Sequence, residues 1–126
     1  MAKILLDTDV ILCWLGGGQP HATLIPQLIE RGDVLAWTPM QLADMSYFCR
    51  SSDRQTIDWL CQALETVPTT AEVGKLAGAY LISYMQSQHL TPNNAMIAAS
   101  AVVNDIPLWT LSRPLYPIPD LKFFTP

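Results

Sequence analysis

The chain opens on an aliphatic run, Ile4-Leu5-Leu6, which leads into two carboxylates one residue apart, Asp7 and Asp9. A short, unbroken aliphatic stretch is typical of a strand that is buried on both faces, as in a parallel sheet. A carboxylate where such a strand ends lies at the carboxyl edge of the sheet, where open α/β folds bind ligands. This opening therefore predicts both a fold class and the place to look for chemistry.

Strand-like and helix-like stretches alternate along the rest of the chain. Short apolar runs predict inner strands over 34–37 and 106–110 and a terminal edge strand over 121–124. Apolar spacing and capping residues predict helices over 10–15, 21–31, 39–50, 53–64, 69–86 and 93–103. Asp9 is expected to cap the first of these helices, and Thr69 and Glu72 have the spacing of a capping box. The alternation predicts one α/β domain, residues 1–126, with helices packed around a parallel sheet.

The composition is that of a compact globular protein with little charge. Half of the 126 residues are hydrophobic, 14% are charged, and the formal net charge is −4. A negative balance argues against a basic nucleic-acid-binding module, although a metal-dependent nuclease can be acidic overall because its ions meet the phosphate. The low charge content also suggests that a partner or a second copy covers some apolar surface.

The expected location is the cytoplasm, without a membrane segment. Asp7 and Asp9 interrupt any signal-peptide core, and no apolar stretch approaches the roughly 20 residues that span a bilayer. Cys13, Cys49 and Cys61 are odd in number and include no Cys-x-x-Cys pair, which is typical of reduced core thiols in a cytosolic protein.

Four polar residues fall on comparable positions of the predicted fold. Asp7 ends the first strand, and Asp44 lies on the helix that follows the second. Asn94 lies in the first turn of the alanine-rich helix, and Ser112 lies just beyond the last inner strand. Because the ends of neighbouring parallel strands and the nearby helix starts meet at one edge, these side chains are expected to converge on one cleft.

Four stretches in this order resemble the PIN-domain family, in particular toxins of the VapC type, whose members are metal-dependent ribonucleases. The stretches are LLDTDVIL, TPMQLADM, LTPNNAMIAASAVVNDIPLWTLSR and YPIPDLKFF. The resemblance covers nearly the whole chain. It implies a PIN-like three-layer α/β/α sandwich with a mostly parallel sheet of four to five strands.

The resemblance also assigns the candidate site. The family places an Asp at the end of the first strand, a Glu on the third helix, an Asp in an [ND]-D-A-x-I-A-A motif and an Asp or Asn after a T-x-[DN]. Asp7 matches the first acid directly, whereas Asp44 stands at the Glu position. Asn94 stands where the family has its third acid, and Ser112 at the fourth position. Whether Asn94 is natural or was introduced to silence the enzyme stays open.

By this resemblance Asp7, Asp44 and Asn94 are the catalytic and metal-binding residues for Mg²⁺ or Mn²⁺, with Ser112 as a fourth candidate. Such an ion relieves repulsion between carboxylates and activates water for attack on an RNA phosphodiester. The implied partners are an RNA substrate, a cognate antitoxin and a second copy in a homodimer. Because Asn94 lacks the acid's charge, the site is expected to be weakened or inactive.

Simpler interpretations stand beside this one. Asp9 is expected to be a helix cap before it is a metal ligand, Asp44 is equally an exposed helix residue, and Ser112 is equally a loop hydroxyl. For the whole chain, the alternative to a ribonuclease is a catalytically inactive PIN-fold module that acts only by binding protein.

Overall fold

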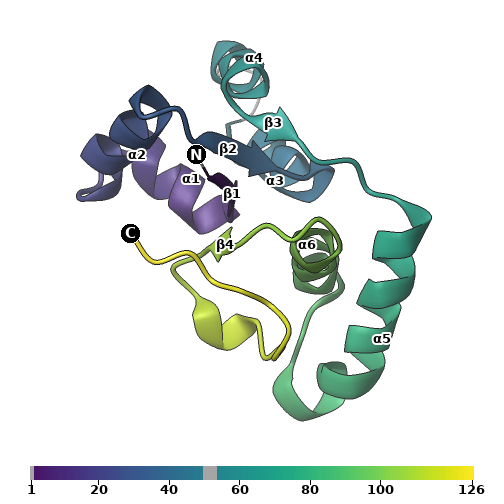
Figure 1. Cartoon of the computed structure of the whole chain (residues 1–126). Helices are drawn as coiled ribbons and strands as arrows, with labels where there is room; N and C mark the ends of the chain where they lie inside the picture. Colours follow the sequence, from purple (N-terminus) through teal and green to yellow (C-terminus); the bar gives the residue numbers. More distant parts are fainter. Residues whose placement is uncertain (1, 50–53) are drawn as a thin grey trace.

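The computed structural model describes residues 2–49 and 54–126 and has a four-stranded parallel sheet at its centre (Figure 1). The strands are β1 (Lys3–Leu6), β2 (Val34–Trp37), β3 (Glu65–Thr66) and β4 (Leu108–Trp109). Their order is β3-β2-β1-β4, so β1 lies inside the sheet with β2 and β4 on its two sides. The predicted α/β fold with a mostly parallel sheet is confirmed.

Within the described residues, six α-helices connect and cover these strands. They are α1 (Thr8–Leu15), α2 (His21–Glu30), α3 (Pro39–Cys49), α4 (Arg54–Ala63), α5 (Ala71–Gln88) and α6 (Pro92–Val103), followed by a short 3₁₀ turn, Arg113–Leu115. The predicted helix ends at Arg50 and Asp53 lie outside the described residues. The expected capping box at Thr69 is wrong by one residue, because the Thr70 side chain accepts the hydrogen bond from the Val73 amide that starts α5.

Alternation along the inner strands divides the interior into two cores. Successive strand side chains point to opposite faces, so Ile4 and Leu6 join one core and Leu5 joins the other. The first core is filled mainly from α1, α2, α3 and α4, and the second mainly from α5 and α6. Figure 1 shows α5 and α6 side by side, away from α1 and α2. Helices on both faces of the sheet make the expected three layers.

The edges of the sheet differ from the prediction. The strand expected over 121–124 is reduced to a bridge between Leu108 and Phe123, because only one residue of this proline-flanked segment pairs with β4. Leu108 N donates to Lys122 O (2.9 Å), and Phe124 N donates to Leu108 O (2.8 Å). At the other edge, β3 pairs through two residues only, which is too short to produce an apolar pattern in the sequence.

Two further expectations concern the surface. Cys61 is exposed and Cys13 and Cys49 are half-buried, so the prediction of core thiols is wrong for Cys61, and of the other two only Cys49 packs against a core. Polar neighbours on α4 explain the position of Cys61, since that helix buries only Leu60 against the sheet. Across the part of the chain that the structure describes, no helix combines the length and the apolar character that a membrane span requires.

Candidate metal-binding site

Asp7 stands between β1 and α1 and is the residue that caps the helix. Its backbone is extended (φ −73°, ψ 160°), and its Oδ1 accepts a hydrogen bond of 2.8 Å from the Thr8 amide. The prediction that Asp9 is the cap is therefore wrong. Because α1 begins at Thr8, Asp9 falls in the first turn of the helix and its carboxylate is available for other contacts.

The second carboxylate oxygen of Asp7 is held by two hydroxyl groups. Thr110 Oγ1 and the Tyr116 hydroxyl each donate a hydrogen bond of 2.8 Å to Asp7 Oδ2. Asp7 is only 8% exposed, and this burial raises its pKa, although the hydrogen bonds partly offset the effect. No ion pair of the described residues involves Asp7, so its negative charge is buried without a cationic side chain beside it.

Asp9 contacts the segment that follows β4. Its Oδ2 accepts hydrogen bonds from Ser112 Oγ (2.9 Å) and the Leu111 amide (3.1 Å), and Thr110 Oγ1, whose proton is donated to Asp7, lies 3.4 Å away. Its Oδ1 is buried and has no hydrogen-bond partner among the residues that the structure describes. A buried carboxylate oxygen without a donor is unfavourable by about 1–3 kcal/mol or more, and a cation at this position would relieve that cost.

Asp44 and Asn94 complete the group from α3 and α6. Asp44 Oδ2 accepts hydrogen bonds from Thr8 Oγ1 (2.9 Å) and from Asn93 Nδ2 (3.5 Å), which joins α3 to the starts of α1 and α6. The side chain of Asn94 faces the site, and its Oδ1 lies 3.3 Å from the Tyr116 hydroxyl. Asp44 is thus more than an exposed helix residue.

These side chains line one cavity of about 250 Å³ at the carboxyl end of β1. All the candidate residues of the sequence analysis are among those that form it: Asp7, Thr8, Asp9, Leu12, Asp44, Phe48, Asn93, Asn94, Ser112 and Leu115. Sequence reasoning missed the hydrogen-bonding roles of Thr8, Thr110 and Tyr116. The T-x-S pattern and the YPIPD stretch pointed to their segments, but not to the atoms that they contact.

The donor set of the cavity fits a single hard cation better than a closely bound pair. It offers three carboxylates, two side-chain amides and two hydroxyls, all with oxygen atoms of the type that Mg²⁺ and Mn²⁺ prefer as ligands, and one of these oxygens is Asp9 Oδ1, which has no partner among the described residues. Among residues 2–49 and 54–126, however, no three His, Cys, Asp or Glu side chains are grouped as a metal cluster. A cation here would therefore also need waters, which Mg²⁺ commonly keeps.

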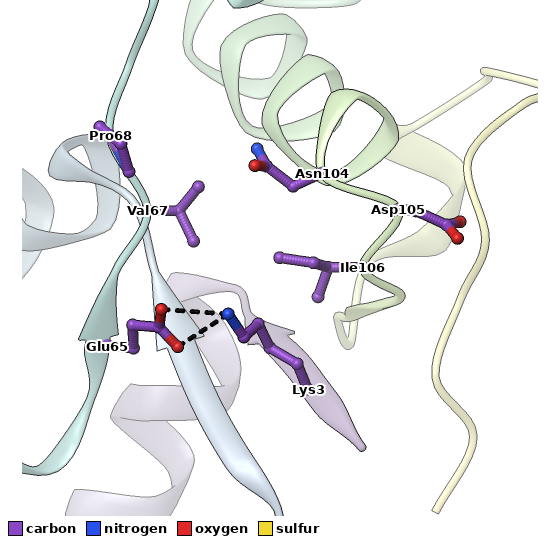
Figure 2. Close-up of a pocket in the computed structure, with 7 residues that line it drawn as sticks. All are labelled: Lys3, Glu65, Val67, Pro68, Asn104, Asp105 and Ile106. Carbon is purple, nitrogen blue, oxygen red and sulfur yellow. Dashed lines mark hydrogen bonds and ion pairs between the residues drawn. The ribbon is translucent and has the colours of Figure 1, made fainter. Parts of the chain in front are cut away.

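A second cavity, of about 300 Å³, lies at the amino ends of the strands and has a different character (Figure 2). Figure 2 shows the Lys3 ammonium group facing both carboxylate oxygens of Glu65, at 2.9 Å and 3.0 Å. Asp105 points away from this pair. In this second cavity the charges of Lys3 and Glu65 neutralise each other. The smaller acidic cavity at the carboxyl end of β1 is therefore the better candidate for chemistry.

Comparison with known proteins agrees with this fold. No family model matches the chain. VapBC from Salmonella typhimurium, solved bound to DNA, superposes with a TM-score of 0.79 at 17% identity and covers 98% of each chain. VapBC2 from Rickettsia felis, bound to a promoter DNA fragment, gives a TM-score of 0.78 at 18% identity over 97% of each chain. The chain therefore has the fold of VapC-type PIN domains.

Sequence comparison points to the same family. Ribonuclease VapC19 of Mycobacterium tuberculosis (strain CDC 1551 / Oshkosh) is 25% identical over 120 residues, which are 94% of this chain and 96% of that protein. VapBC-5 from the same species has a TM-score of 0.68 at 20% identity over the full length of both chains. The resemblance to PIN-domain proteins of the VapC type is confirmed.

The buried charge of Asp7 predicts a pH-dependent gain of stability when it is neutralised. Because folding raises its pKa above 3.8, the folded state binds more protons than the unfolded chain above that pH, and the contribution of Asp7 to stability falls as the pH rises. Asp7→Asn is expected to raise the metal-free Tm by about 3–6 °C at pH near 7 and by much less near pH 3. Thermal unfolding at both pH values measures this, and a lower Tm for the variant at pH 7 would contradict it.

Proposed function

We propose that this protein is a metal-dependent endoribonuclease, the toxin of a toxin–antitoxin pair, with a weakened metal site. The observation that carries the proposal is the cavity lined by Asp7, Asp9 and Asp44, in which one buried carboxylate oxygen has no hydrogen-bond partner within residues 2–49 and 54–126. Similarity to a protein named as a VapC ribonuclease over nearly the whole chain supports the reaction type.

In this proposal Asp7 is the central ligand for one Mg²⁺ or Mn²⁺ ion. Hydrogen bonds to both of its oxygens fix the orientation of its carboxylate. Asp9 and Asp44 approach from α1 and α3, so they can hold the ion or the water molecules bound to it. Such an ion supplies a more acidic bound water and neutralises charge on the phosphate, and the water is the nucleophile.

Asn94 and Ser112 explain why the site is weak. An amide oxygen can still bind a cation, but it lacks the negative charge, which is worth roughly 4 kcal/mol for a pair of unit charges at about 4 Å and an effective dielectric constant near 20. Ser112 donates its hydroxyl hydrogen bond to Asp9 and so orients that carboxylate. At the position where the family has an Asp or Asn, this chain therefore has a serine that orients Asp9.

The proposed partners are an RNA substrate, an antitoxin and a second copy of the chain, all in the cytoplasm. Structures with this fold include toxin–antitoxin complexes. Two exposed apolar regions favour two protein partners. One is Leu12, Phe48 and Leu115 around the acidic cavity, and the other is Ile82 and Met85 on α5. A partner on the first region would block the cavity, whereas one on α5 would leave it open.

Titration of Mn²⁺ by calorimetry at pH near 7.5 tests the metal site. The unchanged protein is expected to bind one ion weakly, Asp7→Ala is expected to bind none, and Asn94→Asp is expected to bind at least about tenfold more tightly because it restores a charged ligand. Asp58→Asn, a change of an exposed acid on α4, is the matched control and should leave binding unchanged.

The opposite outcome supports the alternative function. If none of the variants binds Mn²⁺, including Asn94→Asp, the proposal of a weakened ribonuclease is wrong. The protein is then better described as an inactive module that acts through its apolar surfaces.

A further inference from the structure

The hydroxyl group of Tyr116 lies between two of the proposed metal ligands. It is 2.8 Å from Asp7 Oδ2 and 3.3 Å from Asn94 Oδ1. Tyr116 is only 3% exposed, so bulk water does not compete for these contacts. Tyr116 lies in the irregular segment after β4, 109 positions along the chain from Asp7.

The direction of this hydroxyl is fixed by the backbone. Tyr116 N donates to Arg113 O (2.9 Å) and closes the 3₁₀ turn, while Ile118 N donates to Tyr116 O (2.8 Å). The ring packs in the core formed with α5 and α6. With the backbone tied on both sides and the ring enclosed, the hydroxyl cannot leave the acidic group without a rearrangement of the core.

Because a phenol donates a hydrogen bond, the Tyr116 hydroxyl can stabilise the Asp7 carboxylate where a bound cation otherwise would. A neutral phenol has one proton to donate, and the shorter contact shows that it is donated to Asp7. A cation that bound Asp7 and Asn94 together, at metal–oxygen distances of about 2.0–2.2 Å, would need the space between the two oxygens. The Tyr116 hydroxyl occupies that space. An ion bound to both residues and the hydrogen bond from Tyr116 to Asp7 therefore exclude each other.

We propose that the Tyr116 hydroxyl is an internal competitor for the metal ion. It satisfies Asp7 in the absence of metal, keeps a cation away from the side of Asn94 and confines it to the side of Asp9 and Asp44. The inference rests on the proposed metal site. It adds that the low affinity has a second cause besides the loss of charge at Asn94. Tyr116 is in this sense a positioning residue and not a ligand.

Removal of the hydroxyl tests this directly. Tyr116→Phe is expected to bind Mn²⁺ about tenfold more tightly than the unchanged protein, because Asp7 Oδ2 loses one hydrogen-bond donor and the ion gains access to the side of Asn94. The matched control is Tyr80→Phe, which removes a buried hydroxyl that has no hydrogen-bond partner from α5, away from the acidic group. It should leave the affinity unchanged. If Tyr116→Phe does not fold, Tyr116→Met serves as a second variant without the hydroxyl.

A combined variant separates competition from a purely structural role. The gain in Mn²⁺ affinity from Asn94→Asp is expected to be larger in the Tyr116→Phe background, since there the ion can reach both carboxylates without displacing the Tyr116 hydroxyl. If Tyr116→Phe leaves the affinity unchanged or weakens it while binding still depends on Asp7, the competition is disproved and the metal site stands. If no variant binds Mn²⁺, both the metal site and the competition are disproved.

Discussion

Asp7→Asn is expected to lower the rate of Mn²⁺-dependent RNA cleavage by at least about a hundredfold. The amide keeps the size of the side chain and can still hydrogen-bond to Thr8, Thr110 and Tyr116. It removes the one charge at the centre of the proposed site, and with it most of the attraction for a divalent ion. The measurement is the initial rate of cleavage of a labelled single-stranded RNA at saturating Mn²⁺, with Asn94→Asp as the parent so that the basal rate is measurable.

Two controls give this result its meaning. Asp58→Asn changes the same type of side chain on the exposed face of α4 and should cleave at the parental rate. The metal-free Tm of Asp7→Asn should be no lower than that of its parent, because burial raises the pKa of Asp7 and its charge opposes folding. Loss of activity without loss of stability is the signature of a functional residue. Retained cleavage in Asp7→Asn would refute the assignment of Asp7.

The second large effect concerns stability. Trp37→Ala is expected to lower the free energy of unfolding by about 3–5 kcal/mol, enough to unfold much of a marginally stable domain. Trp37 ends β2, is fully buried, and its indole Nε1 donates a hydrogen bond of 3.0 Å to Thr66 Oγ1 of β3. The substitution leaves a large cavity beside β1 and also removes one of the side-chain contacts to the two-residue strand β3, another being the Lys3–Glu65 ion pair.

Denaturant unfolding of three variants divides this effect into its parts. Trp37→Phe retains most of the packing and loses the hydrogen bond to Thr66, so it should cost only about 1–2 kcal/mol. Trp59→Ala, at a half-exposed position that contacts Trp14, should cost less than Trp37→Ala. Equal losses for Trp37→Ala and Trp59→Ala would show that β2 does not anchor the sheet as the structure indicates.

Local sequence patterns predicted the elements that carry strong local signals. The aliphatic run before Asp7 became β1, and the threonine–proline pairs at Thr38 and Thr91 mark the starts of α3 and α6. Predictions failed where the local signal was weak or shared. Thr69 and Thr70 are adjacent cap candidates, and two residues of β3 contain too little pattern to be recognised.

The candidate site shows the same division. Residue type and position relative to the predicted strands were sufficient to name Asp7, Asp44, Asn94 and Ser112, all of which line one cavity. The role of Asp9 was not accessible, because a carboxylate at the start of a helix is chemically suited both to capping and to binding a cation. Only the position of the first helical residue, Thr8, distinguishes the two.

By itself the sequence determined the order of the helices and of every strand but β3, and the resemblance to VapC-type PIN domains, since both depend on residues that are close together in the chain. The tertiary structure alone decided that Asp7 caps α1, that one oxygen of Asp9 is left unpartnered, and that the Tyr116 hydroxyl lies against Asp7. Asp7 and Tyr116 are 109 positions apart in the sequence. Such a contact depends on how two cores pack on opposite faces of one sheet, and no local pattern encodes that distance.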